Sequence, residues 1–267
     1  MGIRDILVHL DNSAASSARL DLAILYALKH GARLRGLYLI THLFYEPRAL
    51  GEKVNSETAE NLFNAKTSEA GIVAEWVLQD STVMGLSASD LVTMHAYFTD
   101  LIVVGQADTS APVINIPNDL AERVVLSSGR PVLIVPYSGT FKTAGDRVMI
   151  AWKTGRESVR AVNDSLPHLH KAQTVFIVES RSNPENGDGS LKAINSFLLN
   201  HDIRVAIDLI NAGNFPIGDM LLNTICEKKA DLLVMGAFAP NRRGHLEMSP
   251  VARHVLKHLT APVLMSH

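Results

Sequence analysis

Short runs of β-branched and other apolar residues alternate along this chain with longer segments whose apolar residues show helical spacing. This alternation is expected when crossover helices cover both faces of a parallel sheet. The pattern therefore predicts a doubly wound α/β fold. The predicted strands are Ile6–Leu10, Gly36–Ile40, Glu75–Leu78, Leu101–Gly105 and Val132–Val135, followed by Arg147–Ala151, Thr174–Val178, Ala206–Leu209, Leu232–Gly236 and Val263–Ser266.

The segment between the first two predicted strands has the clearest helical pattern. Its apolar positions have the spacing of one helix face: Leu20, Ala23, Ile24, Ala27 and Leu28. Ser13 precedes this face, and serine is a favoured residue at a helix N-terminus. The sequence therefore predicts a core-facing helix capped by Ser13.

An internal repeat organises the chain. Asp100–Gly105 reads DLIVVG and Asp231–Gly236 reads DLLVMG, 131 positions later. The same offset relates Pro131–Leu133 to Pro262–Leu264. A constant offset of this kind indicates a duplication.

The linker between the two copies lies in Pro136–Asp146, a stretch rich in Gly, Pro, Ser and Thr and without apolar periodicity. A domain has typically about 100 to 150 residues, so a chain of 267 residues accommodates two. We therefore expect one domain over residues 1–143 and a second, similar domain over residues 144–267.

Composition excludes several classes of partner. Basic and acidic residues number 25 and 27, for a net charge of −2, so no charge excess favours nucleic acid or an anionic membrane. No apolar run approaches the ~20 residues that span a bilayer. Cys226 is the single cysteine and cannot form an internal disulfide, which suits a reducing cytoplasm. Its helical neighbours predict a buried structural thiol.

Three blocks resemble universal stress proteins. The closing block from Asp231–Gly236 through Ala261–His267 is similar to the C-terminal end of that family. Ile6–Ser13 is similar to its first strand and following loop, and Gly129–Pro136 to its last strand. The resemblance covers most of both halves. It implies a tandem of two Rossmann-like domains of the adenine nucleotide alpha hydrolase type, each with a five-stranded, mainly parallel sheet.

The resemblance also implies an assembly. Family members commonly dimerise through their last strands, so a tandem chain is expected to pair Val132–Val135 with Val263–Ser266. The result would be an intramolecular pseudo-dimer about a pseudo-two-fold axis, with both sheet edges covered. A further homodimer of whole chains stays open.

Nucleotide-binding members of the family carry Gly-x-x-Gly and, after a longer gap, Gly-Ser or Gly-Thr. In the first half Gly105 is present, but Asp108 stands at the second glycine and Asn118-Asp119 at the Gly-Ser position. Both acidic residues would repel a polyphosphate, and Asn118-Asp119 suits a helix cap. The loop after the first strand holds the base in binders; Asp11 lies there and could equally cap the helix or its approach loop.

The second half is closer to the binding motif. Gly236 is present, Ala239 replaces the second glycine, and Ser249-Pro250 replaces Gly-Ser. Pro250 lacks the backbone N–H and the hydroxyl that a phosphate would contact. Ser249-Pro250 also suits a helix N-cap with proline in the first turn, a purely structural arrangement.

Four further residues of the second half are candidate ligand contacts. Arg242 and Arg243 lie in the loop between the motif positions and could meet an anion, or be solvated. Lys153 takes the place of Asp11 after the first strand of this half. Trp152 precedes it and could stack on a base, although core packing is the favoured interpretation. If any cofactor binds, ATP in this half is expected.

No catalytic motif accompanies these residues, and a conventional enzyme is not indicated. His254 and His258 share a helix face, but no cysteine cluster supports a metal site. The sequence favours a regulatory or ligand-binding protein of the stress response that acts through a conformational change or through a regulatory partner. The alternatives are an ATP-binding switch with slow hydrolysis in the second half, and a carrier of small or lipid-like molecules.

Overall fold

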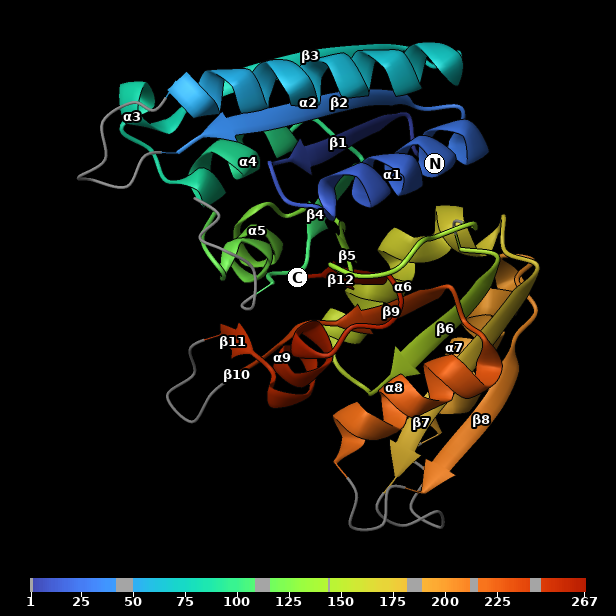
Figure 1. Ribbon diagram of the computed structural model, residues 1–267. Coiled ribbons are helices and arrows are strands. Elements are labelled where there is room, and N and C mark those ends of the chain that lie inside the picture. The colour runs from blue at the N-terminus through green and yellow to red at the C-terminus, as the bar shows by residue number, and fades with distance from the viewer. Residues whose placement is uncertain are drawn as a thin grey trace. The chain divides into compact units, whose positions relative to one another are not determined.

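The computed structural model describes residues 2–41, 50–108, 116–143, 145–181, 189–211, 216–240 and 246–267. The chain divides into two compact units, Met1–Ala144 and Gly145–His267, here called unit 1 and unit 2 (Figure 1). Each unit has a parallel sheet of five strands with helices between the strands. The predicted doubly wound α/β class is confirmed.

Unit 1 follows the predicted alternation of strands and helices. Its elements are β1 (Asp5–Leu10), α1 (Ser16–His30), β2 (Arg33–Ile40), α2 (Leu50–Glu69), β3 (Ala74–Asp80), α3 (Ser81–Met84), α4 (Ala88–Ala96), β4 (Leu101–Gly105), α5 (Leu120–Ser127) and β5 (Val132–Val135).

Among the described residues, unit 2 repeats this plan with a short antiparallel hairpin after β9 and a single helix between β8 and β9. Its elements are β6 (Arg147–Trp152), α6 (Arg156–Leu169), β7 (Thr174–Arg181), α7 (Ser190–Asn200), β8 (Ala206–Asn211), α8 (Ile217–Lys228), β9 (Leu232–Gly236), β10 (Phe238–Pro240), β11 (Leu246–Met248), α9 (Pro250–Lys257) and β12 (Val263–Ser266). β10 and β11 form the hairpin.

The strand order is the same in both units. It is β3-β2-β1-β4-β5 in unit 1 and β8-β7-β6-β9-β12 in unit 2, and neighbouring strands within each unit are parallel. The order reverses between β1 and β4, and between β6 and β9. In open sheets of this kind ligands bind beyond the carboxyl ends of the strands at that reversal.

The apolar runs form the buried centre of each sheet. Every residue of β1 and β5 is buried, and so are the first four residues of β4 and β9. Central parallel strands are covered on both faces, which explains why they read as continuous apolar runs. In unit 1, α1 and α2 contact each other, as do α4 and α5, consistent with one pair of helices on each face.

The start of α1 differs from the prediction. The N-cap residue is Ala15, no side chain caps the helix, and the predicted cap Ser13 is wrong. Leu28 is 52% exposed, so it is not part of the buried face either. The other four predicted positions are buried, and the buried face is wider than predicted because it also includes Arg19, Tyr26 and His30.

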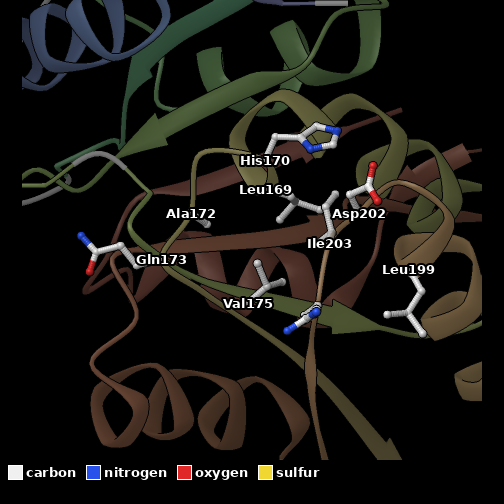
Figure 2. A pocket seen from close by; sticks show the side chains of 9 residues that line it. Leu169, His170, Ala172, Gln173, Val175, Leu199, Asp202 and Ile203 are labelled. Atoms are coloured by element: carbon white, nitrogen blue, oxygen red, sulfur yellow. The ribbon is translucent and has the colours of Figure 1, made fainter.

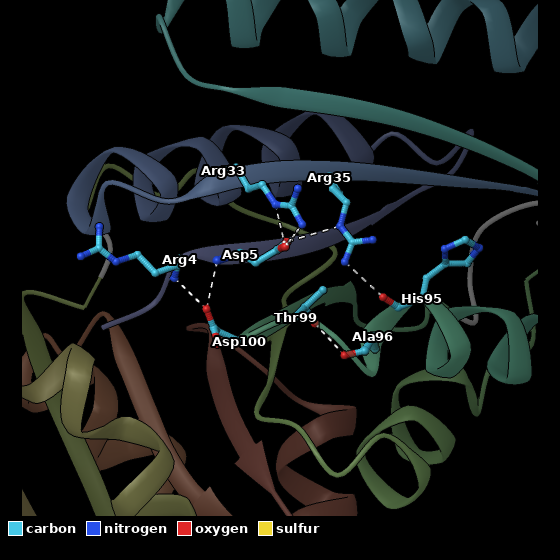
Figure 3. Close-up of polar contacts among 8 residues, drawn as sticks. All are labelled: Arg4, Asp5, Arg33, Arg35, His95, Ala96, Thr99 and Asp100. Atoms are coloured by element: carbon cyan, nitrogen blue, oxygen red, sulfur yellow. Dashed lines mark hydrogen bonds and ion pairs between the residues drawn. The ribbon is translucent and has the colours of Figure 1, made fainter. Parts of the chain in front are cut away.

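The amino ends of the strands carry two features. In unit 2 a cavity of about 590 Å³ lies where α6 and α7 end and β7 begins (Figure 2). In unit 1, Asp100 accepts hydrogen bonds from the backbone N–H groups of Arg4 and Asp5 at 2.8 and 3.1 Å (Figure 3).

The corresponding aspartate of unit 2 has the same role. Asp231 accepts from the N–H groups of Asp146 and Arg147 at 3.0 and 2.7 Å. The aspartate that opens each repeated DL block therefore fixes the start of the neighbouring strand, β1 or β6. Each carboxylate satisfies two N–H groups at a sheet end, a structural role that repeat analysis alone did not reveal.

In the part of the chain that the structure describes, no helix is both long and apolar enough to cross a membrane.

Candidate functional site

Five of the predicted ligand residues lie at the carboxyl ends of strands, next to the reversal of strand order. Asp11 follows β1 and Gly105 ends β4 in unit 1. Trp152 ends β6, Lys153 follows it, and Gly236 ends β9 in unit 2. We call these two places the unit 1 crevice and the unit 2 crevice.

In the unit 1 crevice, Asp11 organises the loop that leads into α1. Its Oδ1 accepts a hydrogen bond from the backbone N–H of Ser13 at 2.9 Å and another from the Ser13 hydroxyl. The backbone N–H of Asp11 donates to Ser16 Oγ at 3.2 Å. Of the two structural roles that the sequence allowed for Asp11, the loop role is the one formed here.

Arg19 fills the space between Asp11 and Gly105. Its guanidinium Nη2 lies 2.7 Å from Asp11 Oδ2, and its side chain is only 3% exposed. A Cβ atom at Gly105 would collide with Arg19 Nη1. Gly105 is therefore the residue that leaves room for the cation, and the chain's own charge lies over the first position of the glycine motif.

Sequence reasoning missed Arg19, although a signal for it exists. Arg19 stands four residues before Ala23 and eight before Ala27, on the same helix face. Both alanines are fully buried. A cation in register with a buried face needs a buried anion as partner, and Asp11 is the acidic residue at the end of the preceding strand.

The electrostatics of the unit 1 crevice favour a charged pair beside a neutral histidine. His9 is buried, and neither of its ring nitrogens has a hydrogen-bond partner among the described residues. Burial, with a smaller contribution from Arg19, lowers the pKa of His9 to about 4, although Asp11 opposes this. Burial would raise the pKa of Asp11, but Arg19, His9 and the Ser13 hydrogen bonds outweigh it and hold that pKa well below its usual value.

The unit 2 crevice is closed in a different way. A Cβ atom at Gly236 would lie 2.7 Å from the carbonyl carbon of Glu157 and 2.8 Å from the backbone nitrogen of Ser158. Both belong to the first turn of α6. Gly236 thus allows the backbone of a helix to approach the end of β9.

The two base-side candidates of unit 2 separate in the structure. Trp152 is buried, and its indole N–H donates to Ser190 Oγ at 3.2 Å, at the start of α7. This is the core-packing arrangement that the sequence favoured over stacking on a base. Lys153 is exposed.

The Ser249-Pro250 pair forms the structural arrangement that the sequence allowed as an alternative. Ser249 is the N-cap of α9 and its Oγ accepts from the N–H of Ala252 at 3.1 Å, while Pro250 occupies the first turn. Ala239 lies in β10 opposite Glu247 of β11. Arg242 and Arg243 lie outside the described residues.

The expected cap at Asn118-Asp119 is only partly formed. Asp119 is the N-cap residue of α5, but its carboxylate accepts no hydrogen bond from the helix backbone. It instead accepts from Arg123 Nε at 2.6 Å, an exposed pair four residues apart. Charged neighbours one helical turn apart compete for a carboxylate that could otherwise cap.

Other candidate chemistry does not form a site among the described residues. His254 Nε2 lies 2.7 Å from Asp219 Oδ1, and the His254 and His258 rings are 4.7 Å apart. Across the described ranges no group of three or more His, Cys, Asp or Glu side chains could hold a metal ion. The predicted burial of Cys226 is wrong, because this thiol is exposed.

Comparison with known proteins agrees with this architecture. No protein-family profile matches the chain, and no curated protein matches it in sequence. Among solved structures, a universal stress protein from Archaeoglobus fulgidus DSM 4304 is similar over 98% of this chain and 97% of its own, with 17% identity and a TM-score of 0.74. A functionally unknown protein from Pseudomonas aeruginosa PAO1 is similar over 99% and 92%, with 18% identity and a TM-score of 0.65. The chain therefore has the fold of a tandem universal stress protein.

Proposed function

We propose that this chain, which has the tandem universal stress protein fold, is a regulatory or ligand-binding protein of the cellular stress response. We further propose that unit 1 does not hydrolyse nucleotides. The observation that carries this proposal is the Arg19–Asp11 pair. It places a buried guanidinium over Gly105, where the glycine motif of nucleotide-binding members would bring a phosphate. A ligand phosphate would have to displace the Arg19 side chain, whose charge is already neutralised by Asp11.

Unit 2 keeps the ATP alternative, with weak binding. The backbone of the first turn of α6 lies against Gly236, and Ser249 Oγ already accepts a hydrogen bond from the α9 backbone. Any affinity must then come from Arg242, Arg243 and the remaining N–H groups of α9. A slow ATP-binding switch would act through this unit alone.

The function is tested by titrating ATP and magnesium into the full chain. We expect the amide resonance of Gly105 to stay unchanged, because Arg19 covers it. The rate of phosphate release from ATP is expected to equal the rate in buffer without the protein. A saturable shift of the Gly105 amide would contradict the proposal, whereas ATP-dependent phosphate release would favour the switch.

A carrier role has a different readout. Native mass spectrometry of the gently purified chain would show an apolar or lipid-like molecule that stays bound to the folded protein. The regulatory proposal expects the mass of the bare chain.

The single Cys226 continues to favour a reducing cytoplasm as the place of action.

We also propose the internal pseudo-dimer, in which β5 and β12 pair edge to edge. Its support is that each strand ends the strand order of its own unit, so each sheet would otherwise leave an apolar edge open. Cysteines at Leu133 and Leu264, with Cys226→Ser, should form a disulfide within one chain. Failure to cross-link within the chain under oxidising conditions would count against this pairing.

A further inference from the structure

The cavity at the amino end of the unit 2 sheet is separate from the crevice at the carboxyl end. Its volume of about 590 Å³ falls within the range of about 300 to 1,000 Å³ that is usual for small-molecule sites. It is formed entirely within unit 2, where α6 ends at Leu169, β7 begins at Thr174 and α7 ends at Asn200. Figure 2 shows the side chains that line it.

The floor of the cavity is apolar. Leu169, Val175 and Ile203 line it and are each at most 4% exposed. Figure 2 shows these three side chains among those that line the cavity. Leu199 adds an apolar side chain that is 49% exposed. Leu199 therefore offers most of the apolar surface that a ligand could contact here.

Opposite charges lie at the rim. Asp202 and Arg204 both line the cavity and both are exposed. Within the described ranges neither side chain has a hydrogen bond or ion pair with another residue. They are two residues apart in the chain, so a carboxylate and a guanidinium lie within reach of one small molecule.

The two positions of unit 1 that correspond to Asp202 and Arg204 are uncharged. Ile72 N–H donates to Thr67 O at 3.2 Å after α2, as Ile203 N–H donates to Leu198 O at 2.9 Å after α7. The residue before each isoleucine has a positive φ, +64° at Gly71 and +59° at Asp202. Gly71 and Val73 thus occupy in unit 1 the places of Asp202 and Arg204, so the charge pair is particular to unit 2.

Asp202 adopts a backbone conformation that favours glycine, and the equivalent residue of unit 1 is a glycine. Helix folding alone therefore does not explain the carboxylate. The helices α6 and α7 both end at this cavity, and their negative dipole ends favour a cation there.

We propose that this cavity binds a small zwitterion with an apolar body, namely an apolar α-amino acid. Its ammonium group lies at Asp202 and the ends of α6 and α7. Its carboxylate lies at Arg204, and its side chain packs against Leu199 above the buried floor of the cavity. This inference does not depend on the function proposed for the crevices, because it concerns the opposite end of the sheet.

Isothermal titration of the full chain with L-leucine and L-phenylalanine tests the class of ligand. N-acetyl-L-leucine keeps only the carboxylate and L-leucinamide only the ammonium. Each of these is expected to bind roughly two- to fivefold more weakly than L-leucine, because both rim charges are exposed and partly screened. Absence of binding by both amino acids at millimolar concentration, or equal binding by all analogues, would overturn the proposal.

The chain itself supplies matched variants. Asp202→Gly and Arg204→Val reproduce the residues of unit 1, and Asp202→Gly removes a strained backbone position, so both should fold. Asp202→Gly should weaken L-leucine binding and leave N-acetyl-L-leucine binding unchanged. Arg204→Val should weaken L-leucine binding and leave L-leucinamide binding unchanged. The proposal would also be contradicted if Asp202→Gly weakened N-acetyl-L-leucine binding or Arg204→Val weakened L-leucinamide binding. It would equally be contradicted if L-leucine binding weakened only in variants whose unfolding midpoint falls.

Discussion

The two crevices differ in what lies over the glycine that ends the strand. In unit 1 the guanidinium of Arg19 lies over Gly105, and in unit 2 the first turn of α6 lies over Gly236. The strand orders are the same, and both glycines end the strand next to the reversal. One glycine therefore leaves room for a side chain and the other for a helix backbone. A glycine at this place does not by itself indicate a phosphate site.

The largest expected effect comes from Arg19→Met, which keeps much of the side-chain volume and removes the charge. Asp11 would stay buried without its cation. Removing one partner of a buried pair typically costs about 3 to 5 kcal/mol, and we expect a loss in that range in urea unfolding. Partial protonation of Asp11 would reduce it.

The matched control is Arg123→Met, which breaks the exposed pair with Asp119. Exposed pairs are screened by water, so its effect on the free energy of unfolding should be far smaller. Equal losses in the two variants would show that the Arg19 pair is not effectively buried, and the comparison of the crevices would fail.

Alanine at the two glycines sharpens the comparison next. Gly236→Ala places a methyl group against the α6 backbone, which moves only with the helix, so we expect a loss of about 2 to 3 kcal/mol. Gly105→Ala meets the end of a flexible arginine side chain, so a loss of about 1 kcal/mol is expected.

Both expected losses are to be measured by urea unfolding of the full chain. Combining Gly105→Ala with Arg19→Met removes the group that the new methyl would meet, so the second substitution should add less than its separate effect. Strict additivity, or a larger loss at Gly105 than at Gly236, would contradict the assignment of the two neighbours.

The largest contribution to the pH dependence of stability is expected from His9 of unit 1. The folded-state pKa of His9, about 4, is below its ordinary 6.5, so the unfolded chain takes up the proton first. The stabilisation that neutral His9 contributes is complete above its ordinary pKa of 6.5 and is lost as the pH falls toward its folded-state pKa of about 4. Between about pH 7 and pH 5 the loss amounts to roughly 2 kcal/mol.

Replacement His9→Leu removes this titration and should flatten the slope of unfolding free energy over that range. His95 and His267 also have lowered pKa values, so part of the slope stays in the variant. Asp11 acts with the same sign but only below its ordinary pKa of 3.8. An unchanged slope in His9→Leu would mean that His9 is not held neutral.

The last expected effect concerns ATP affinity at unit 2 rather than stability. Pro250→Ser restores a backbone N–H and adds a hydroxyl at the first turn of α9. A hydrogen bond to a charged group contributes about 1.5 to 3 kcal/mol, so affinity should rise roughly tenfold or more. Ala239→Gly should raise it further if the phosphate approaches the backbone there. The measurement is calorimetric titration at fixed salt and magnesium.

The unit 1 counterpart, Asp119→Ser, is the control for this experiment. It also offers a hydroxyl at a helix start, but Arg19 still covers Gly105, so no gain in ATP affinity is expected. A gain equal to that of Pro250→Ser would show that the side chain in the unit 1 crevice does not exclude the nucleotide.

Much of the fold was predictable from the sequence. Leu101–Gly105, Val132–Val135, Leu232–Gly236 and Val263–Ser266 have the predicted bounds, and the other strands extend theirs by a few residues. Continuous apolar runs identify central strands because those strands are buried on both faces. Helix faces were less certain: in α8 the buried positions include Leu221, Leu222 and Ile225, and the next residue, Cys226, already faces outward.

The sequence by itself determined the duplication, the strands and the α/β class, because burial of apolar surface imposes a period that can be read along the chain. It also placed Asp11, Gly105 and Gly236 at the carboxyl ends of the strands. Only the tertiary structure decided their neighbours. Whether Arg19 or the α6 backbone lies over a glycine depends on contacts between residues far apart in sequence, and such contacts have no period.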